Sequence, residues 1–212
     1  MVGMNLAMMV TGPFQTNCYI VSDGERATVI DPGLGAAPAI TQHLKDTGLT
    51  LEQVLLTHGH IDHTRDAAAV ANQLGCTVYI HPADAGMLKD GSGVSEQARE
   101  LFDATSMPYP DSLEYLHDAE EITICGANFT VRHAPGHSPG SVLFVGEKVC
   151  FSGDVLFAGS IGRTDLPGSD TAAMKNSLAT VVAKLKAELH VLPGHGPETT
   201  MAAELKSNPF LA

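Results

Sequence analysis

The stretch Thr57-His58-Gly59-His60-Ile61-Asp62-His63 places three imidazoles and one carboxylate within seven residues. It follows an apolar run, Gln53 to Thr57, that predicts a buried strand ending in a loop. In extended chain His58 and His60 point to the same face, so both can bind one cation. Asp62 and His63 follow as the chain turns into a helix, where their side chains diverge and can serve a second cation. A bare HxH pair could be an ordinary pair on a solvated loop, but HxHxDH is far more specific and predicts a metal site.

Three further residues of ligand type lie downstream: His137 in Ala134-Pro135-Gly136-His137-Ser138-Pro139-Gly140, Asp154 in Phe151-Ser152-Gly153-Asp154, and His195 in Leu192-Pro193-Gly194-His195-Gly196-Pro197. In each, an apolar or β-branched segment runs into a turn with Gly or Pro, as expected if strand ends converge on one pocket. Glycine beside a ligand permits close backbone approach and unusual dihedral angles. Imidazole and carboxylate ligands suit zinc, iron or manganese.

This ordered set of residues resembles the metallo-β-lactamase superfamily over nearly the whole chain. The resemblance implies an α/β fold, a four-layer αββα sandwich with the metals at one edge between the sheets. It also implies two divalent metal ions, zinc first, with iron or manganese as alternatives. The implied ligands are His58, His60 and His137 for the first metal and Asp62, His63 and His195 for the second, with Asp154 bridging the two.

Composition favours one domain over residues 1–212, since 44% of the residues are apolar and no charged or Ser/Gly-rich linker divides the chain. Hydrophobic patterns predict strands and helices in alternation in the first half and a second sheet in the second half. The expected strands are 6–10, 18–21, 27–30, 53–57, 77–80, 122–124, 129–133, 142–145, 149–152 and a strand running into Pro193. The expected helices are 36–47, one with Ala67, Val70, Ala71 and Leu74 on one face, a short one at 96–102, one with Met174, Leu178, Val181, Val182 and Leu185 on one face, and one from Glu198.

The cysteines and the charge indicate the setting. Cys18, Cys76, Cys125 and Cys150 form no CxxC pair and lie in apolar strand contexts, which predicts free core thiols in a reducing, cytoplasmic compartment. No apolar run approaches the roughly 20 residues of a membrane helix, and the amino end reads as a strand rather than a signal peptide. The net charge of −12 points away from nucleic acid as a partner.

Two cations about 3.5–4 Å apart can share a water, lower its pKa and hold the resulting hydroxide as nucleophile. Asp62 would orient this hydroxide and Asp154 would bridge the metals, so both are expected to be catalytic. Within the superfamily, the segment from Gly153 to Asp170 is similar to that of short glyoxalase II-like thioesterases, as are Pro193 to Thr200 and the ending Asn208-Pro209-Phe210-Leu211. The resemblance implies hydrolysis of a small-molecule thioester, such as glutathione-derived S-D-lactoylglutathione.

Two departures bear on the substrate. Two-domain glyoxalase II enzymes bind glutathione partly through a further helical domain, which is not expected in this chain. They also carry a Lys and a Tyr near a position where this chain reads Gly162-Arg163-Thr164-Asp165. Arg163 could bind a substrate carboxylate, but an internal Arg163–Asp165 ion pair is the favoured alternative.

Other functions stay open. Persulfide dioxygenases of the same superfamily share the GRTD segment and use one iron, which makes an oxidoreductase the main rival. A hydrolase of another ester-like molecule and a metal-binding protein without catalysis are further alternatives.

Three residues near the motifs have roles that the sequence leaves open. Asp31 could orient a metal-bound histidine or form a turn with Pro32 and Gly33. His81 could line the pocket or cap a turn, and His133, on a strand leading to His137, could contact a metal-binding side chain. The irregular loop 89–111 is where we expect acyl preference to be set, while the acyl group and the oligomeric state do not follow from the sequence.

Overall fold

The computed structural model describes residues 4–211, which form two mixed β-sheets of six strands each. The first half contains β1 (Asn5–Thr11), β2 (Thr16–Ser22), β3 (Arg26–Ile30), α1 (Ala36–Thr47), β4 (Thr50–Leu55), α2 (Ile61–Thr64), α3 (Ala67–Leu74), β5 (Thr77–Ile80), the 3₁₀ turn η1 (Ala85–Lys89), α4 (Glu96–Leu101), η2 (Ala104–Ser106) and β6 (Leu113–Tyr115). The second half contains β7 (Glu121–Ile124), β8 (Ala127–His133), β9 (Val142–Val145), β10 (Val149–Gly153), α5 (Thr171–Thr180), η3 (Val182–Lys184), β11 (His190–Pro193), β12 (Thr199–Thr200) and α6 (Met201–Ser207).

The strand order follows the chain in both sheets. The first sheet runs β1-β2-β3-β4-β5-β6, and the second runs β12-β11-β10-β9-β8-β7. Neighbours joined by short turns pair antiparallel, whereas β3–β4, β4–β5, β5–β6 and β10–β11 pair parallel. A parallel pair needs a crossover: α1, α3 and α5 supply three of these four, and the segment with η1, α4 and η2 supplies the one between β5 and β6.

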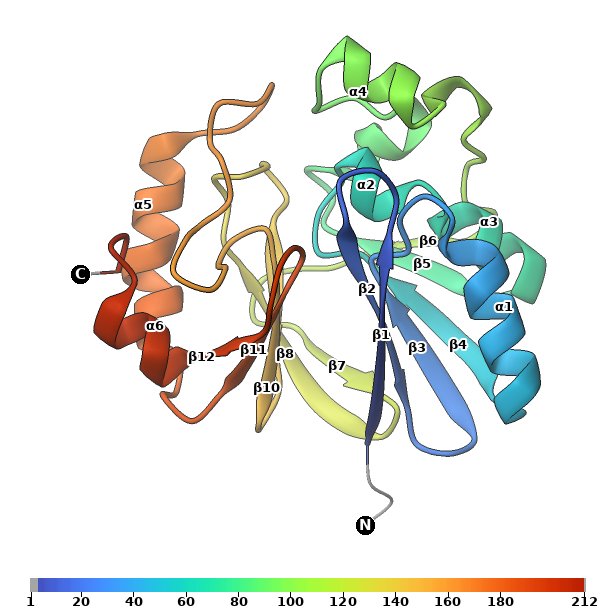
Figure 1. Cartoon of the computed structure of the whole chain (residues 1–212), viewed down its shortest axis with the longest axis horizontal. Helices are drawn as coiled ribbons and strands as arrows, with labels where there is room; N and C mark the ends of the chain where they lie inside the picture. Colours follow the sequence, from blue (N-terminus) through green and yellow to red (C-terminus); the bar gives the residue numbers. More distant parts are fainter. Residues whose placement is uncertain (1–3, 212) are drawn as a thin grey trace.

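The apolar residues form layers. Between the sheets, Ile30 and Leu55 of the first pack with Phe144 and Phe151 of the second in one buried cluster. A separate cluster joins α1 and α3 to the outer face of the first sheet, and another joins α5 to the outer face of the second. Figure 1 shows these helices on opposite sides of the two sheets, with α6 beside α5. The expected four-layer αββα sandwich is therefore confirmed.

The predicted elements are mostly confirmed, and the differences have local causes. The motif strand ends at Leu55 rather than Thr57, because the Thr57 amide donates to the Asp31 carboxylate instead of a neighbouring strand. The helix expected to reach Leu185 ends at Thr180 and continues as the 3₁₀ turn η3, at a pair of β-branched valines that favour helix poorly.

One further element was predicted with the wrong start, and one short strand was missed. The last helix begins at Met201 rather than Glu198, because the Thr200 side chain caps it by accepting from the Ala203 amide. Thr199 and Thr200 also pair with β11. Strand β6 was not predicted, since its three residues follow the irregular loop and lack a clear alternation.

All four cysteines are free, as predicted. Cys18 and Cys150 lie buried in strands, but Cys125 lies in the turn between β7 and β8, and Cys76 is partly exposed before β5, so the strand expectation was wrong for these two. Within residues 4–211, no helix has both the length and the apolar character needed to span a bilayer.

Candidate metal centre

The seven side chains predicted as ligands come together at one end of the sandwich. His58 and His60 lie in the loop after β4, and Asp62 and His63 lie on the short helix α2. The other three follow or join strands of the second sheet: His137 between β8 and β9, Asp154 directly after β10, and His195 after β11. All are buried except His195, whose side chain is 25% exposed.

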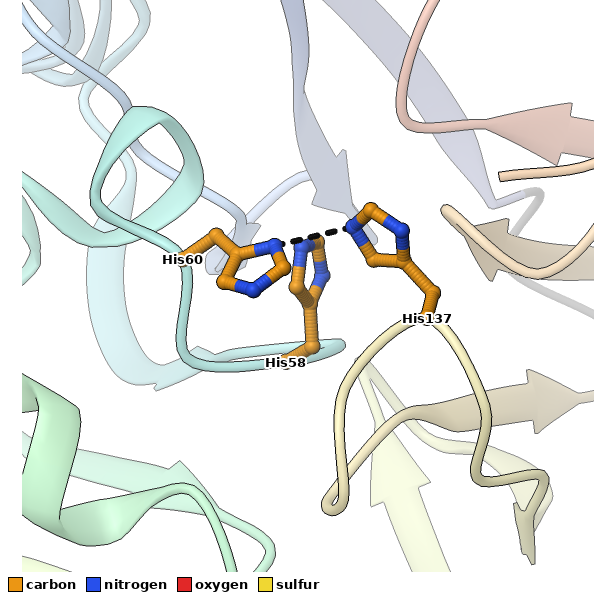
Figure 2. Close-up of side chains that lie close together, drawn as sticks. All are labelled: His58, His60 and His137. Carbon is orange, nitrogen blue, oxygen red and sulfur yellow. Dashed lines mark hydrogen bonds between the residues drawn. The ribbon is translucent and has the colours of Figure 1, made fainter. Parts of the chain in front are cut away.

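His58, His60 and His137 form the first set. Their nearest ring nitrogens lie within 4.8 Å of one another, and Nδ1 of His60 lies 2.9 Å from Nε2 of His137. Figure 2 shows the three rings turned toward a common point. Nε2 of His58 is buried without a hydrogen-bond partner among the described residues. Because zinc binds imidazole nitrogens at about 2.0–2.1 Å, a metal ion shared by the three rings fits these separations and the unpartnered nitrogen.

Asp62, His63 and His195 form the second set, again within 4.8 Å. Nε2 of His195 lies 3.2 Å from Nε2 of His63 and 3.2 Å from Oδ2 of Asp62. Thr16 donates its hydroxyl to the same Asp62 oxygen at 3.1 Å, which fixes the carboxylate. These three groups could hold a second cation.

Asp154 lies between the two sets. Its Oδ2 is 3.4 Å from Nε2 of His137 in the first set and 3.5 Å from Nε2 of His195 in the second. Its Oδ1 is 3.4 Å from Nε2 of His63. A methyl group on Gly194 would collide with this carboxylate, so the residue before His195 must be glycine for the side chains to approach this closely.

Asp31 holds residues of both sets. Its Oδ2 lies 3.0 Å from Nδ1 of His63, and the same oxygen accepts the Thr57 hydroxyl at 2.6 Å. The Thr57 hydroxyl is in turn 3.1 Å from Nδ1 of His58. One nitrogen each of His58 and His63 and one oxygen of Asp31 also lie within 4.8 Å of one another, close enough to bind a metal. The Asp31 oxygens, however, already accept hydrogen bonds from Thr57 and His63. Asp31 therefore contacts His63 directly and His58 through Thr57, and the Gly33 amide also donates to the Asp31 carbonyl at 3.0 Å, so the orienting contact and the turn are both present.

Backbone carbonyls hold two more of the histidines. Nδ1 of His137 lies 2.8 Å from the Arg163 carbonyl, and Nδ1 of His195 lies 3.1 Å from the Phe14 carbonyl. With the Nδ1 contacts to Asp31 and Thr57, these carbonyls leave Nε2 directed toward the centre in four histidines: His58, His63, His137 and His195. His60 is different, because it turns Nδ1 inward.

Sequence reasoning missed Asp84, which lies shortly after β5 and is completely buried. Its carboxylate accepts the Gly59 amide at 2.8 Å, the Ser138 hydroxyl at 2.6 Å and the Gly140 amide at 2.6 Å. Burial raises its pKa, although these hydrogen bonds oppose the shift. Asp84 thus ties the loop of His58 and His60 to the loop of His137. Its only signal in the sequence is a position just beyond a strand end.

The two sets differ in electrostatics when no metal is bound. Burial lowers the pKa of His58 well below its usual range and that of His60 to about 3. Burial also opposes charge on His63 and His195, but the nearby carboxylates outweigh it, so that the pKa of His63 is raised and that of His195 is about 9. Near neutral pH His58 and His60 are therefore uncharged, and His195 carries a proton.

A cavity of about 410 Å³ opens onto the ligand cluster. Arg163 lines it, and its guanidinium donates to both carboxylate oxygens of Asp165, at 2.6 and 2.8 Å. The predicted alternative of an internal ion pair is therefore confirmed. His81 and His133 do not line the cavity and instead stack on each other with ring centres 4.1 Å apart. Burial and the neighbouring His133 lower the pKa of His81 to about 4.

Comparison with known proteins agrees with this geometry. The family model described as metallo-beta-lactamase superfamily matches residues 11–195. The chain is 34% identical to the hydroxyacylglutathione hydrolase GloC of Haemophilus influenzae, with 98% of each chain covered.

Two solved structures are similar as well. BLEG-1, described as a B3 metallo-beta-lactamase, is 38% identical with a TM-score of 0.87, over 98% of this chain and all of that one. TTHA1623, solved in a di-iron-bound form, is 39% identical with a TM-score of 0.82, over 97% of this chain and all of that one.

Proposed function

Because the chain belongs to the metallo-beta-lactamase superfamily, we propose that it is a dinuclear metal-dependent hydrolase that cleaves thioesters. S-D-lactoylglutathione is the first substrate to consider, since the similar GloC protein is named for hydroxyacylglutathione hydrolysis. Zinc is the proposed metal, with iron the leading alternative because the similar TTHA1623 was solved with two irons. The four free thiols support a cytoplasmic setting as part of the proposal.

One observation carries the dinuclear assignment: the position of Asp154 between two complete sets of ligands. Its carboxylate lies within 3.5 Å of histidine nitrogens from both sets. A protein that used a single ion would need only one set, yet Asp62, His63 and His195 are also buried and oriented by outer hydrogen bonds. A carboxylate reaching both is what two neighbouring ions require as a bridge.

Different residues of the centre have different roles in the proposed hydrolysis. Two bound divalent cations would supply a nucleophile from water near neutral pH and would polarise the substrate carbonyl. The Asp62 carboxylate, held by the Thr16 hydroxyl, faces the same space as His195 and would orient that water. Asp31 and the Arg163 and Phe14 carbonyls fix the histidine rings, so little reorganisation is needed during the reaction.

Two other activities are candidates for this site. A persulfide dioxygenase would take up oxygen, and the intact second set counts against it. Lactam hydrolysis is a second candidate because the similar BLEG-1 is described as a B3 metallo-beta-lactamase. A lactam and a thioester both present a carbonyl to the same nucleophile, so the cluster alone does not discriminate between them.

The test measures thiol release from S-D-lactoylglutathione by the metal-loaded protein. Hydrolysis of a β-lactam and oxygen uptake with glutathione persulfide are measured on the same preparation. Asp154→Ala is the inactive reference, and Asp46→Ala, which removes an exposed carboxylate on α1 remote from the ligand loops, is the matched control. We expect thiol release by the wild type and by Asp46→Ala well above that of Asp154→Ala. Oxygen uptake or lactam cleavage without thiol release would overturn the thioesterase assignment.

A further inference from the structure

The cavity over the metal centre has apolar walls from two separate segments. Val94 and Ala98 come from α4 and the residue pair before it, and Phe157, Ile161 and Leu166 come from the segment between β10 and α5. These two segments lie over different sheets at the same end of the molecule (Figure 1). Hereafter these five residues are called the apolar walls.

Both walls are fixed by hydrogen bonds to other parts of the fold. The Gly159 amide donates to the buried Glu204 carboxylate at 2.9 Å, and the Asn208 side chain donates to the Ser160 carbonyl at 3.1 Å. On the other side, Arg65 donates to the carbonyl of Phe102, directly after α4, at 2.7 Å. The cavity is therefore preformed, and its lining can select among substrates.

Outside the ligand cluster, the cavity lining contains a single charged side chain. The lining residues outside the ligand cluster are the apolar walls, Phe14, two serines and Arg163. Arg163 is the one basic residue in this lining, and Asp165 already neutralises it with a two-point ion pair. A glutathione thioester brings two carboxylates and an ammonium group, and the lining offers no other charged side chain to receive them above the metal ligands. The net charge of −12 adds no attraction for an anion.

We propose that this site takes a thioester with an apolar acyl group of several carbons, and that a glutathione carrier contributes little to its binding. The inference rests on the proposed thioesterase function. In the reaction water forms the new C–O bond, the C–S bond breaks, and the thiol leaves with a proton, so no oxidant or reductant is required. The apolar walls would bury the acyl chain while the carbonyl reaches the metal centre.

Four thioesters test the proposal: D-lactoyl and hexanoyl groups, each on glutathione and on the uncharged thiol N-acetylcysteamine. Each buried methylene is worth up to about a fourfold gain in kcat/KM. We therefore expect hexanoyl to exceed D-lactoyl by at least about tenfold on the same carrier, and the carrier to change kcat/KM by less than about threefold. Higher kcat/KM for D-lactoyl, or a gain of tenfold or more from glutathione, would overturn the inference while leaving the thioesterase assignment intact. Hydrolysis of none of the four would refute that assignment and the inference with it.

A matched pair of variants locates the preference. Leu166 lines the cavity, whereas Leu101 lies on α4 outside the cavity lining and is 54% exposed. Leu166→Ser should lower the ratio of hexanoyl to D-lactoyl kcat/KM at least about fivefold, mainly through KM. Leu101→Ser should leave that ratio unchanged. Equal ratios in the two variants would show that the apolar walls do not bind the acyl chain.

Discussion

Replacing Asp31 by Asn tests how the outer hydrogen bonds control the metal centre. Asp31 has a φ of 52°, in the left-handed region, which Asn tolerates better than most residues, so the backbone is preserved. The carboxylate accepts three hydrogen bonds, from the Thr57 amide, the Thr57 hydroxyl and Nδ1 of His63. An amide side chain has only one acceptor atom, so it cannot accept all three.

Both orientations of the new amide carry a cost. If its NH₂ group faces His63, Nδ1 must become the acceptor and the ring proton moves to Nε2, the atom 3.2 Å from His195 that would bind the second metal. Loss of such an outer contact lowers metal affinity about 10–100-fold, or about 1.4–2.7 kcal/mol. If the NH₂ group faces the Thr57 amide, two buried donors oppose each other, which lowers the free energy of unfolding by about 1–3 kcal/mol. For a chain of this size that is a decrease in Tm of about 2 to 12 °C.

The assay is metal content and affinity, measured by elemental analysis after gel filtration and by competition with a chromogenic chelator. Thermal unfolding of the metal-free protein supplies the Tm. Asp46→Asn is the matched control, because Asp46 is an exposed carboxylate on α1, remote from the ligand loops. We expect Asp31→Asn to show either the affinity loss or the Tm loss, and Asp46→Asn to show neither. Two metals bound at wild-type affinity together with an unchanged Tm would refute the role assigned to Asp31.

Three further predictions concern the centre. Asp154→Ala should lose at least one metal per chain and nearly all turnover, and a variant with two metals and full activity would contradict the bridging role. In the metal-free protein the raised pKa of His195, about 9, stabilises the fold fully below about pH 6.5, and this contribution is lost as the pH rises through 9. A metal must displace that proton, so apparent affinity at the second set should rise about tenfold per pH unit from 7 to 9 in chelator titrations, and a flat profile would count against this. Asp84→Ala should lower Tm by about 2 to 12 °C and weaken the first metal, because it frees three buried donors, whereas Ser92→Ala, on a partly exposed loop residue, should change neither.

The clustering of the candidate ligands was predictable because five of the seven stand beside a glycine in a loop that follows a strand, and the other two, Asp62 and His63, complete the HxHxDH motif. The sandwich followed from the resemblance and from alternating strands and helices, and the structure confirms it. Errors arose where short-range preference is weak: at the valine pair that ends α5, at the threonines before α6, and at the three-residue strand β6. In each case packing or a single cap decides the boundary.

The hydrogen bonds that orient the ligands could not be read from the sequence in the same way. The carbonyl that faces His195 belongs to Phe14, at the opposite end of the chain, and the one that faces His137 belongs to Arg163. Every residue has a carbonyl, so residue type gives no signal for this role. Asp84 carries a side-chain signal, but its partners are two backbone amides and a serine that become neighbours only in the folded chain.

The contrast between the two sets of ligands implies an order in which they fill. His58 and His60 are uncharged near neutral pH, because burial lowers the pKa of each, so a first metal need not displace protons from them. His195, whose pKa is about 9, is protonated under the same conditions, so a second metal must release this proton before it can bind. A chain with one metal is therefore the expected species at low pH, even though the fold provides ligands for two. A single metal found in protein prepared under acidic conditions would then reflect protonation of the second set, and would not by itself favour a mononuclear oxidoreductase over the hydrolase.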